Sequence, residues 1–304
     1  MDALRSRRGF LQEALVAGAG LASVRGLSAA ASEPSGKGGP ERPLFVRTLG
    51  TGASDHDWAR LGQPGVRGSA GTLVDGHILI DCGTTGSANL ERAGVSPGAV
   101  TDLLITHSHG DHFSAAEIRK VIGLRGKALP PLAVWADPRC LAALERQSPG
   151  PFAGHALAPG AAAEIGRCRV TALPANHLVA EPERALHYLF ETPCGNLLYA
   201  LDGAWMLKQA RQLIGKRRLD MIIWDATMSK AGDYRIFEHN DLDMIGLMMA
   251  SLRTTGAADD KTVCVLDHMA RTLWPADLRE AEKLAAARGW VLASDGMALE
   301  LPAG

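Results

Sequence analysis

The chain has 304 residues, of which 46% are hydrophobic and 21% charged, so it can bury a full core and does not have the composition of a disordered protein. Its 32 basic and 33 acidic residues nearly balance, which excludes a whole-protein field that would recruit polyanions or anionic membranes. Only 5% of the residues are aromatic, which disfavours a binder of single-stranded nucleic acid built on stacking platforms. Any anionic substrate must therefore be held by a local site.

The first 31 residues have the order of an export signal. The pair Arg7 and Arg8 comes first, a small and apolar run follows over residues 14–24, and Ala31 precedes a polar stretch. The run is shorter than the roughly 20 residues of a membrane-spanning helix. It resembles a twin-arginine export signal, which serves proteins that fold before they cross the membrane. We therefore expect a signal over residues 1–31, the twin-arginine export machinery as a partner and a periplasmic or secreted protein; an amphipathic N-terminal helix is the alternative.

Residues 32–43 are rich in Gly, Pro and Ser, which predicts a flexible linker before a single domain over residues 44–304. The cysteines are odd in number and widely spaced, with no metal-binding CxxC pair. They are Cys82, Cys140, Cys168, Cys194 and Cys264. Export would expose them to an oxidising compartment, but no disulfide pairing can be assigned. Most are expected to be small, buried, apolar residues.

From Leu44 onward, short β-rich runs alternate with helical stretches, which is typical of a layered α/β protein. The predicted strands span residues 44–49, 71–74, 78–81, 103–106, 132–136, 169–173, 186–191, 197–201, 221–224 and 263–266. Helical periodicity covers residues 114–124, 204–214, 242–252 and 275–287, and Pro275 suits the first turn of the last helix. Several strands are followed by His or Asp, and these side chains are expected to meet at one edge of a sheet.

The predicted strand over residues 103–106 runs into His107-Ser108-His109-Gly110-Asp111-His112, which places four potential metal ligands within six residues. Imidazole and carboxylate groups bind zinc, manganese and iron, and a turn lets them point inward from different backbone directions. A lone histidine is more often a hydrogen-bonded structural residue, but this cluster predicts a metal site. Ser114 is expected to cap the next helix. Asp225 ends another apolar strand and is expected to orient a ligand histidine.

The run His107–His112 resembles the HxHxDH signature of the metallo-β-lactamase superfamily, and the resemblance extends over nearly the whole mature chain. It implies an α/β fold, the αββα sandwich of two mixed sheets flanked by helices, and two divalent metal ions, zinc or manganese. Carried over residue by residue, the superfamily roles give one ion His107, His109 and His177. They give the other ion Asp111, His112 and His268, with Asp202 bridging the two. His109 replaces the Glu of oxygen-reducing di-iron relatives, which favours hydrolysis.

Flanking motifs resemble the phosphodiesterase branch of this superfamily, and within it the phosphoribosyl cyclic phosphate phosphodiesterases. They include Leu49-Gly50-Thr51-Gly52, Ile80-Asp81-Cys82-Gly83 and Glu238-His239-Asn240-Asp241-Leu242. The resemblance implies that His239 is a general acid, with a helix-capping or surface histidine as the alternative. Arg271 departs from the pattern, because that family tends to carry a further His there. We expect Arg271 either to bind a phosphate oxygen or to pair with a surface carboxylate.

These assignments predict an exported dinuclear hydrolase of small or cyclic phosphodiesters, in which two ions about 3.5–4 Å apart share an attacking hydroxide. Asp111 and His239 are the expected catalytic residues, and His239 and Arg271 the expected substrate contacts. The same metal site suits an ester, lactone or β-lactam hydrolase. A metal-bearing accessory protein, like the superfamily members associated with quinone-cofactor biosynthesis, is a third alternative. No stable nucleic-acid or membrane partner is expected, and the oligomeric state stays open.

Overall fold

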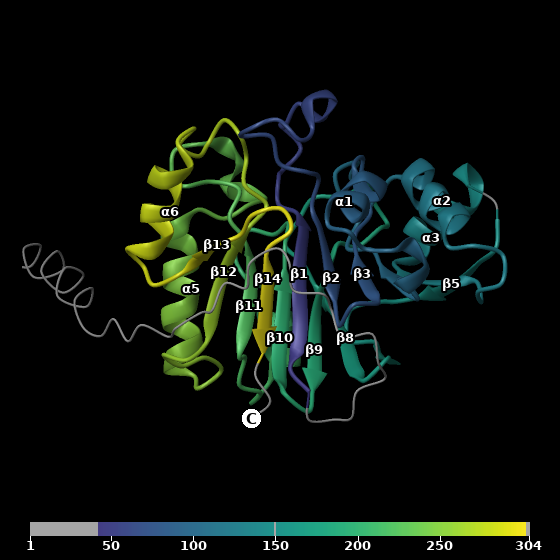
Figure 1. Cartoon of the computed structure of the whole chain (residues 1–304). Helices are drawn as coiled ribbons and strands as arrows, with labels where there is room; N and C mark the ends of the chain where they lie inside the picture. Colours follow the sequence, from purple (N-terminus) through teal and green to yellow (C-terminus); the bar gives the residue numbers. More distant parts are fainter. Residues whose placement is uncertain (1–41, 149, 302–304) are drawn as a thin grey trace, which may run out of the picture.

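The computed structural model describes residues 42–148 and 150–301, and within them two seven-stranded sheets pack face to face (Figure 1). The first sheet has the order β14 (Ala298–Leu301), β1 (Leu44–Gly50), β2 (Gly71–Val74), β3 (Ile78–Ile80), β4 (Asp102–Leu104), β5 (Leu132–Ala136) and β6 (Phe152–Ala156). The second has the order β13 (Val291–Leu292), β12 (Val263–Asp267), β11 (Met221–Asp225), β10 (Gly195–Ala200), β9 (Leu186–Thr192), β8 (Cys168–Pro174) and β7 (Ala162–Ile165). Both sheets combine antiparallel pairs with parallel ones, such as β3 with β4 and β10 with β11.

Three helices cover the outer face of each sheet within the described residues. On the first sheet these are α1 (Gly86–Arg92), α2 (Ala115–Leu124) and α3 (Pro138–Gln147). On the second they are α4 (Lys208–Ile214), α5 (Leu242–Thr254) and α6 (Leu278–Ala286). Three short 3-10 turns complete the set, η1 (Trp58–Arg60), η2 (Pro97–Ala99) and η3 (Tyr234–Phe237). The expected αββα sandwich of two mixed sheets is confirmed.

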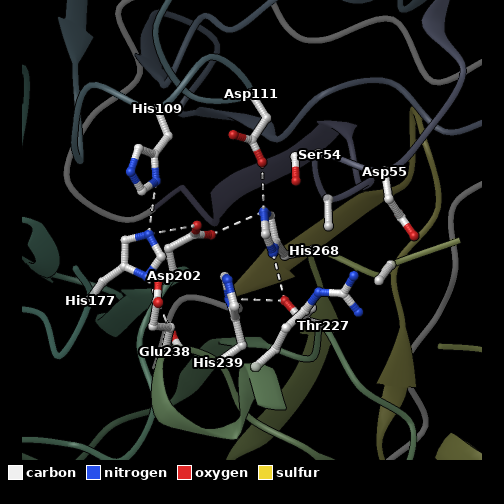
Figure 2. Close-up of a pocket in the computed structure, with 13 residues that line it drawn as sticks. Ser54, Asp55, His109, Asp111, His177, Asp202, Thr227, Glu238, His239 and His268 are labelled. Atoms are coloured by element: carbon white, nitrogen blue, oxygen red, sulfur yellow. Dashed lines mark hydrogen bonds and ion pairs between the residues drawn. The ribbon is translucent and has the colours of Figure 1, made fainter. Parts of the chain in front are cut away.

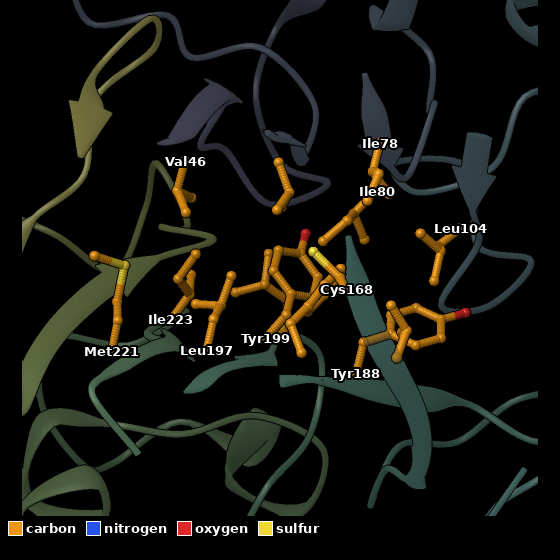
Figure 3. Close-up of a cluster of buried hydrophobic side chains, with 14 of the residues drawn as sticks. Val46, Ile78, Ile80, Leu104, Cys168, Tyr188, Leu197, Tyr199, Met221 and Ile223 are labelled. Carbon is orange, nitrogen blue, oxygen red and sulfur yellow. The ribbon is translucent and has the colours of Figure 1, made fainter. Parts of the chain in front are cut away.

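The apolar core lies between the two sheets, where Val46, Ile80, Tyr199 and Ile223 come together (Figure 3). Side chains alternate along each strand, so Tyr199 of β10 faces this core while its neighbour Leu198 packs beneath the helices of the second sheet. Both faces of a central strand are therefore buried, which explains why the sequences of these strands are continuous apolar runs. The packing fixes the edges of both sheets, from which the functional loops extend.

Two helices begin later than their sequence patterns predict. The helix expected from residue 204 begins at Lys208, because the preceding residues form a loop in which the Trp205 amide donates to Asn240 Oδ1 at 3.0 Å. The helix expected from Pro275 begins at Leu278, where the Asp277 side chain accepts the amide of Arg279 at 2.8 Å. A side-chain cap therefore sets that start, and the prediction of Pro275 in the first turn was wrong. The predicted cap of α2 by Ser114 is confirmed.

The predicted export signal, residues 1–31, and residues 32–41 of the predicted linker lie outside the described residues. The last two residues of that linker are anchored to the domain. The guanidinium of Arg42 pairs with Asp75 at 2.9 Å, and Arg167 donates to the carbonyls of Arg42 and Pro43. Across the described residues, no helix combines the length and apolar character of a membrane span.

All five cysteines are buried, as their sequence context predicts. No disulfide joins Cys82, Cys140, Cys168 or Cys264. Burial raises the pKa of the Cys168 thiol to about 12, so this side chain is a neutral apolar group at physiological pH.

Gly83 allows the turn after β3 to touch the loop that carries Asp111. A Cβ at Gly83 would lie 2.0 Å from the backbone oxygen of Asp111, and backbone cannot yield as a flexible side chain would. We therefore expect Gly83→Ala to lower the free energy of unfolding by about 1–3 kcal/mol in chemical denaturation. Gly110→Ala is the matched control, since a Cβ there meets nothing within 4 Å and its loss should stay within about 0.5 kcal/mol. Equal stability of the two variants would contradict this close approach.

Candidate metal centre

A pocket lies at one edge of the sandwich, between loops that follow the carboxyl ends of strands from both sheets (Figure 2). Five of the seven predicted ligands line it, His109, Asp111, His177, Asp202 and His268. The remaining two, His107 and His112, are fully buried behind them. The loop after β4 supplies one side of the cluster, and the loops after β8, β10 and β12 supply the other. The site therefore depends on the packing of the two sheets against each other.

The structure brings all seven predicted ligands together in two overlapping groups. Ligand atoms of His107, His109, His177 and Asp202 lie within 4.8 Å of one another, and so do those of Asp111, His112, Asp202 and His268. This division matches the one that the sequence predicts, and Asp202 belongs to both groups.

In the first group, imidazole nitrogens face one another across a short gap. His177 Nε2 lies 3.0 Å from His109 Nδ1 and 3.4 Å from Asp202 Oδ2, and His107 Nε2 lies 3.6 Å from the same oxygen. The three imidazoles come from two different sheets, yet their nitrogens point at one spot beside Asp202.

The second group has the same character. His112 Nε2 and His268 Nε2 are 3.2 Å apart, and each lies 3.0 Å from Asp202 Oδ1. Asp111 Oδ2 lies 3.3 Å from His268 Nε2. The two carboxyl oxygens of Asp202 therefore face different groups of histidines, as a bridging carboxylate would.

Hydrogen bonds from the first sheet orient two of the histidines. His112 Nδ1 lies 2.8 Å from Asp81 Oδ2, which is a strong acceptor for its proton. The Thr106 hydroxyl donates to Asp81, so its oxygen is left to accept a proton from His107 Nδ1 at 3.0 Å. This network places both ring protons on Nδ1, which leaves the Nε2 lone pairs of His107 and His112 directed into the cluster.

The second sheet orients its histidines in the same way. The Thr227 hydroxyl donates to Asp225 Oδ1 at 2.7 Å and accepts from His268 Nδ1 at 2.9 Å. His177 Nδ1 lies 3.3 Å from the backbone oxygen of Glu238. The Nε2 lone pairs of His177 and His268 are therefore also directed inward. Asp225 therefore orients His268 indirectly, through the hydroxyl of Thr227.

The donor set fits divalent metal ions. Imidazole nitrogens of His109 and His177 lie 3.0 Å apart, and those of His112 and His268 lie 3.2 Å apart, beside the carboxylate of Asp202. Ligands on a tetrahedral ion with bonds of about 2.0–2.1 Å stand roughly 3.3 Å apart, close to the spacings found here. His107 Nε2 and Asp202 Oδ1 are buried without a hydrogen bond of acceptable geometry, although Asp202 Oδ1 is close to two imidazoles. Positive charge between these atoms satisfies them all.

The backbone is strained at the same place. Asp202 and His268 have φ values of 47° and 60°, and Asp81 behind His112 has a φ of 61°. The left-handed region is uncommon for residues other than glycine, and such residues concentrate at functional sites. The strain turns the carboxylate of Asp202 and the imidazole of His268 out of the strand direction and toward each other.

His239 lies beside the two groups and follows the last residue of η3, Phe237, by two positions. Its Nδ1 is 2.8 Å from Asp225 Oδ2, and its ring stacks against His268 with centroids 5.6 Å apart. Burial opposes the charged imidazolium, but the Asp225 carboxylate outweighs it and raises the pKa of His239 to about 9. With Nδ1 held by Asp225, Nε2 is the nitrogen left for a substrate.

Arg271 is exposed and is bound to the neighbouring loop. Its amide donates to Asp55 Oδ1 at 2.7 Å, and its Nε donates to the Asp55 carbonyl at 3.1 Å. Asp55 lines the pocket, while Arg271 does not. The guanidinium thus contacts the backbone carbonyl of Asp55 and not its carboxylate, so the pairing with a carboxylate and the contact with substrate both stay predictions for Arg271.

Several residues of the site were missed by sequence reasoning. Asp81 was noted only as part of a flanking motif, although its position after a short apolar strand resembles that of the ligands. Arg235 and Glu238 line the pocket from η3 and the residue after it. Glu183 accepts the amide of Ser108 at 2.7 Å and its hydroxyl at 2.6 Å, which fixes the turn between two histidines. Ser108 is thus a tethered turn residue.

The other histidines have structural contacts. His155 stacks on Trp135, and His77 Nδ1 lies 2.9 Å from the Asp75 carbonyl. His187 is buried against the backbone of Asp202, and burial lowers its pKa to about 4, so it supports that residue as a neutral ring.

Comparison with known proteins agrees with this architecture. The sequence matches the beta-lactamase superfamily domain over residues 77–269. Ribonuclease Z of Methanothermobacter thermautotrophicus is 32% identical over 132 residues, which are 39% of this chain and only 40% of that enzyme. A diphosphatase from the PhnP family superposes with a TM-score of 0.66 at 20% identity, over 85% of this chain and 97% of the other. Zinc-bound PqqB from Methylobacterium extorquens gives a TM-score of 0.64 at 17% identity, over 84% and 99%. The chain therefore belongs to the beta-lactamase superfamily and has the metallo-β-lactamase fold with candidate metal-binding residues.

Proposed function

We propose that the protein is a dinuclear metal hydrolase of small or cyclic phosphodiesters, exported by the twin-arginine route. The observation that carries the proposal is the pair of inward-facing histidine groups that share Asp202, with His239 held beside them by Asp225. The names of two similar proteins, a ribonuclease and a diphosphatase, both describe cleavage at phosphorus, which favours a phosphoryl over a carbonyl centre. A twin-arginine route suits a protein that must fold around its metals before export.

In this proposal, His107, His109 and His177 hold one ion, Asp111, His112 and His268 hold the other, and Asp202 lies between them. Zinc or manganese suits these imidazole and carboxylate ligands. When bound, the ions supply an activated water nucleophile and neutralise charge that develops on the phosphoryl oxygens.

The chain contributes the proton for the leaving group. His239 Nε2 donates it to the departing alkoxide, while Asp225 keeps Nδ1 protonated and the ring in place. Asp225 also accepts the amide of Gly203, next to Asp202, so one carboxylate positions both the acid and the bridging residue. The acid is thereby fixed relative to the candidate metal ligands.

Metal analysis tests the ligand assignment. Purified protein is expected to contain two divalent ions per chain by plasma mass spectrometry, and His268→Ala, which removes a ligand of only one group, is expected to contain about one. Chelation should lower the melting temperature, since ions that bind only the folded chain stabilise it. His155→Ala removes a histidine that stacks on Trp135 away from the cluster and should keep two ions. One ion in the unaltered protein, or two in His268→Ala, would contradict the assignment.

The role of His239 is tested by changing the leaving group. For a diester with an alkoxide leaving group, His239→Ala should reduce kcat/KM by about 10²–10³-fold, because the departing oxygen needs a proton. For a p-nitrophenolate leaving group, which leaves without protonation, the loss should stay below about tenfold. Asp111→Ala should abolish both activities. Equal losses for both leaving groups would contradict general-acid catalysis.

A carboxylic ester and a β-lactam, assayed beside the diesters, test the choice of phosphorus over carbon. We expect the metal-loaded protein to cleave the diesters at least a hundredfold more efficiently. Preferential cleavage of the ester or the lactam would leave the metal centre intact and overturn the phosphodiesterase proposal.

A further inference from the structure

Exposed apolar side chains concentrate beside the candidate metal centre. Eight large apolar residues are substantially exposed in the described part of the chain, and four of them, Leu178, Trp205, Tyr234 and Phe237, belong to loops that border the pocket. Leu178 directly follows the pocket residue His177. Trp205 is tied by its amide to Asn240, the residue after His239. Clustered exposed apolar groups mark a binding surface more often than scattered ones do.

The turn η3 organises this surface. Side chains three residues apart eclipse each other in a 3-10 turn, so Tyr234 and Phe237 share one side of η3, while Arg235 lies on another. Arg235 and Glu238 both line the pocket. Tyr234 and Phe237, which are 75% and 80% exposed, therefore stand immediately beside the pocket. The Arg235 guanidinium lies over the Tyr234 ring at 5.4 Å, so the charged and aromatic groups are in contact.

Arg235 is the one Lys or Arg among the described residues that line the pocket. Its Nη1 is buried without a hydrogen bond, although Asp233 Oδ2 lies 3.4 Å away. Its backbone carbonyl accepts the amide of His239 at 2.7 Å, so the guanidinium and the candidate general acid are parts of one rigid turn. A guanidinium that lines the pocket beside the candidate general acid suits a phosphoryl oxygen.

We propose that η3 recognises the substrate, with Arg235 binding a phosphoryl oxygen and the surface of Tyr234 and Phe237 stacking on an aromatic group of the phosphodiester. This inference rests on the proposed function and names its substrate class as phosphodiesters that carry a planar aromatic group. Two exposed rings beside a phosphate-binding cation are complementary to such a molecule, because aromatic groups stack on rings irrespective of their ring substituents.

Calorimetric binding of two phosphonates to the zinc-loaded protein tests the proposal without turnover. Phenylphosphonate should bind at least fivefold more tightly than ethylphosphonate, since only the first has a ring to stack. The double variant Tyr234→Ala/Phe237→Ala should bring the two dissociation constants within twofold of each other. Arg235→Gln should weaken both ligands about tenfold and leave their ratio unchanged. Leu124→Ala and Arg169→Gln alter exposed residues outside the pocket and serve as controls that should change neither constant.

Equal affinities for the two phosphonates, or an unchanged ratio in the double variant, would overturn the inference. If octylphosphonate, which has an alkyl chain and no ring, bound as much more tightly than ethylphosphonate as phenylphosphonate does, the inference would also be overturned. That result would reveal a general apolar contact. If the double variant also changed the molecular mass in solution while the ratio stayed unchanged, the aromatic pair would be an interface between copies of the chain. Diester turnover without a phenyl preference contradicts only this inference, whereas a phenyl preference without diester turnover contradicts the proposed function.

Discussion

Imidazole nitrogens crowd around the carboxylate of Asp202, and this crowding governs the metal centre. The pair His109–His177 approaches to 3.0 Å and the pair His112–His268 to 3.2 Å. Asp81, Thr106 and Thr227 hold the Nδ1 protons of His112, His107 and His268 on the far side of their rings. Such crowding is unfavourable by itself, because the buried nitrogens have lost their water and face like partners. Cations between the nitrogens remove both penalties. The strained backbone of Asp202 and His268 is tolerated for the same reason.

Holding this cluster together is a task shared by both sheets. The first sheet supplies the loop after β4 and orients it from Asp81, while the second supplies Asp202 and His268 and orients them through Asp225. The apolar layer between the sheets keeps the two edges together, as Tyr199 of one sheet and Ile80 of the other show. Metal binding and sheet packing are therefore coupled, and loss of either should weaken the other.

The sequence predicted the fold and the position of the site because both depend on local signals. The strand before His107 is a continuous apolar run, and the four ligand side chains follow it within a few residues. Asp81 and Glu183 were missed as site residues because they act through contacts that are 31 and 75 residues away along the chain. Arg235 lies in a short turn without periodicity, where no pattern says which way its side chain faces. The start of α6 was misplaced because the Asp277 cap competes with the proline signal.

Anomalous diffraction from crystals of the metal-loaded protein would locate the two cations expected on either side of Asp202. We expect two anomalous peaks, one among His107, His109 and His177 and the other among Asp111, His112 and His268, each next to one carboxyl oxygen of Asp202. A single peak, or peaks away from Asp202 in protein that analysis shows to be fully loaded, would contradict this expectation.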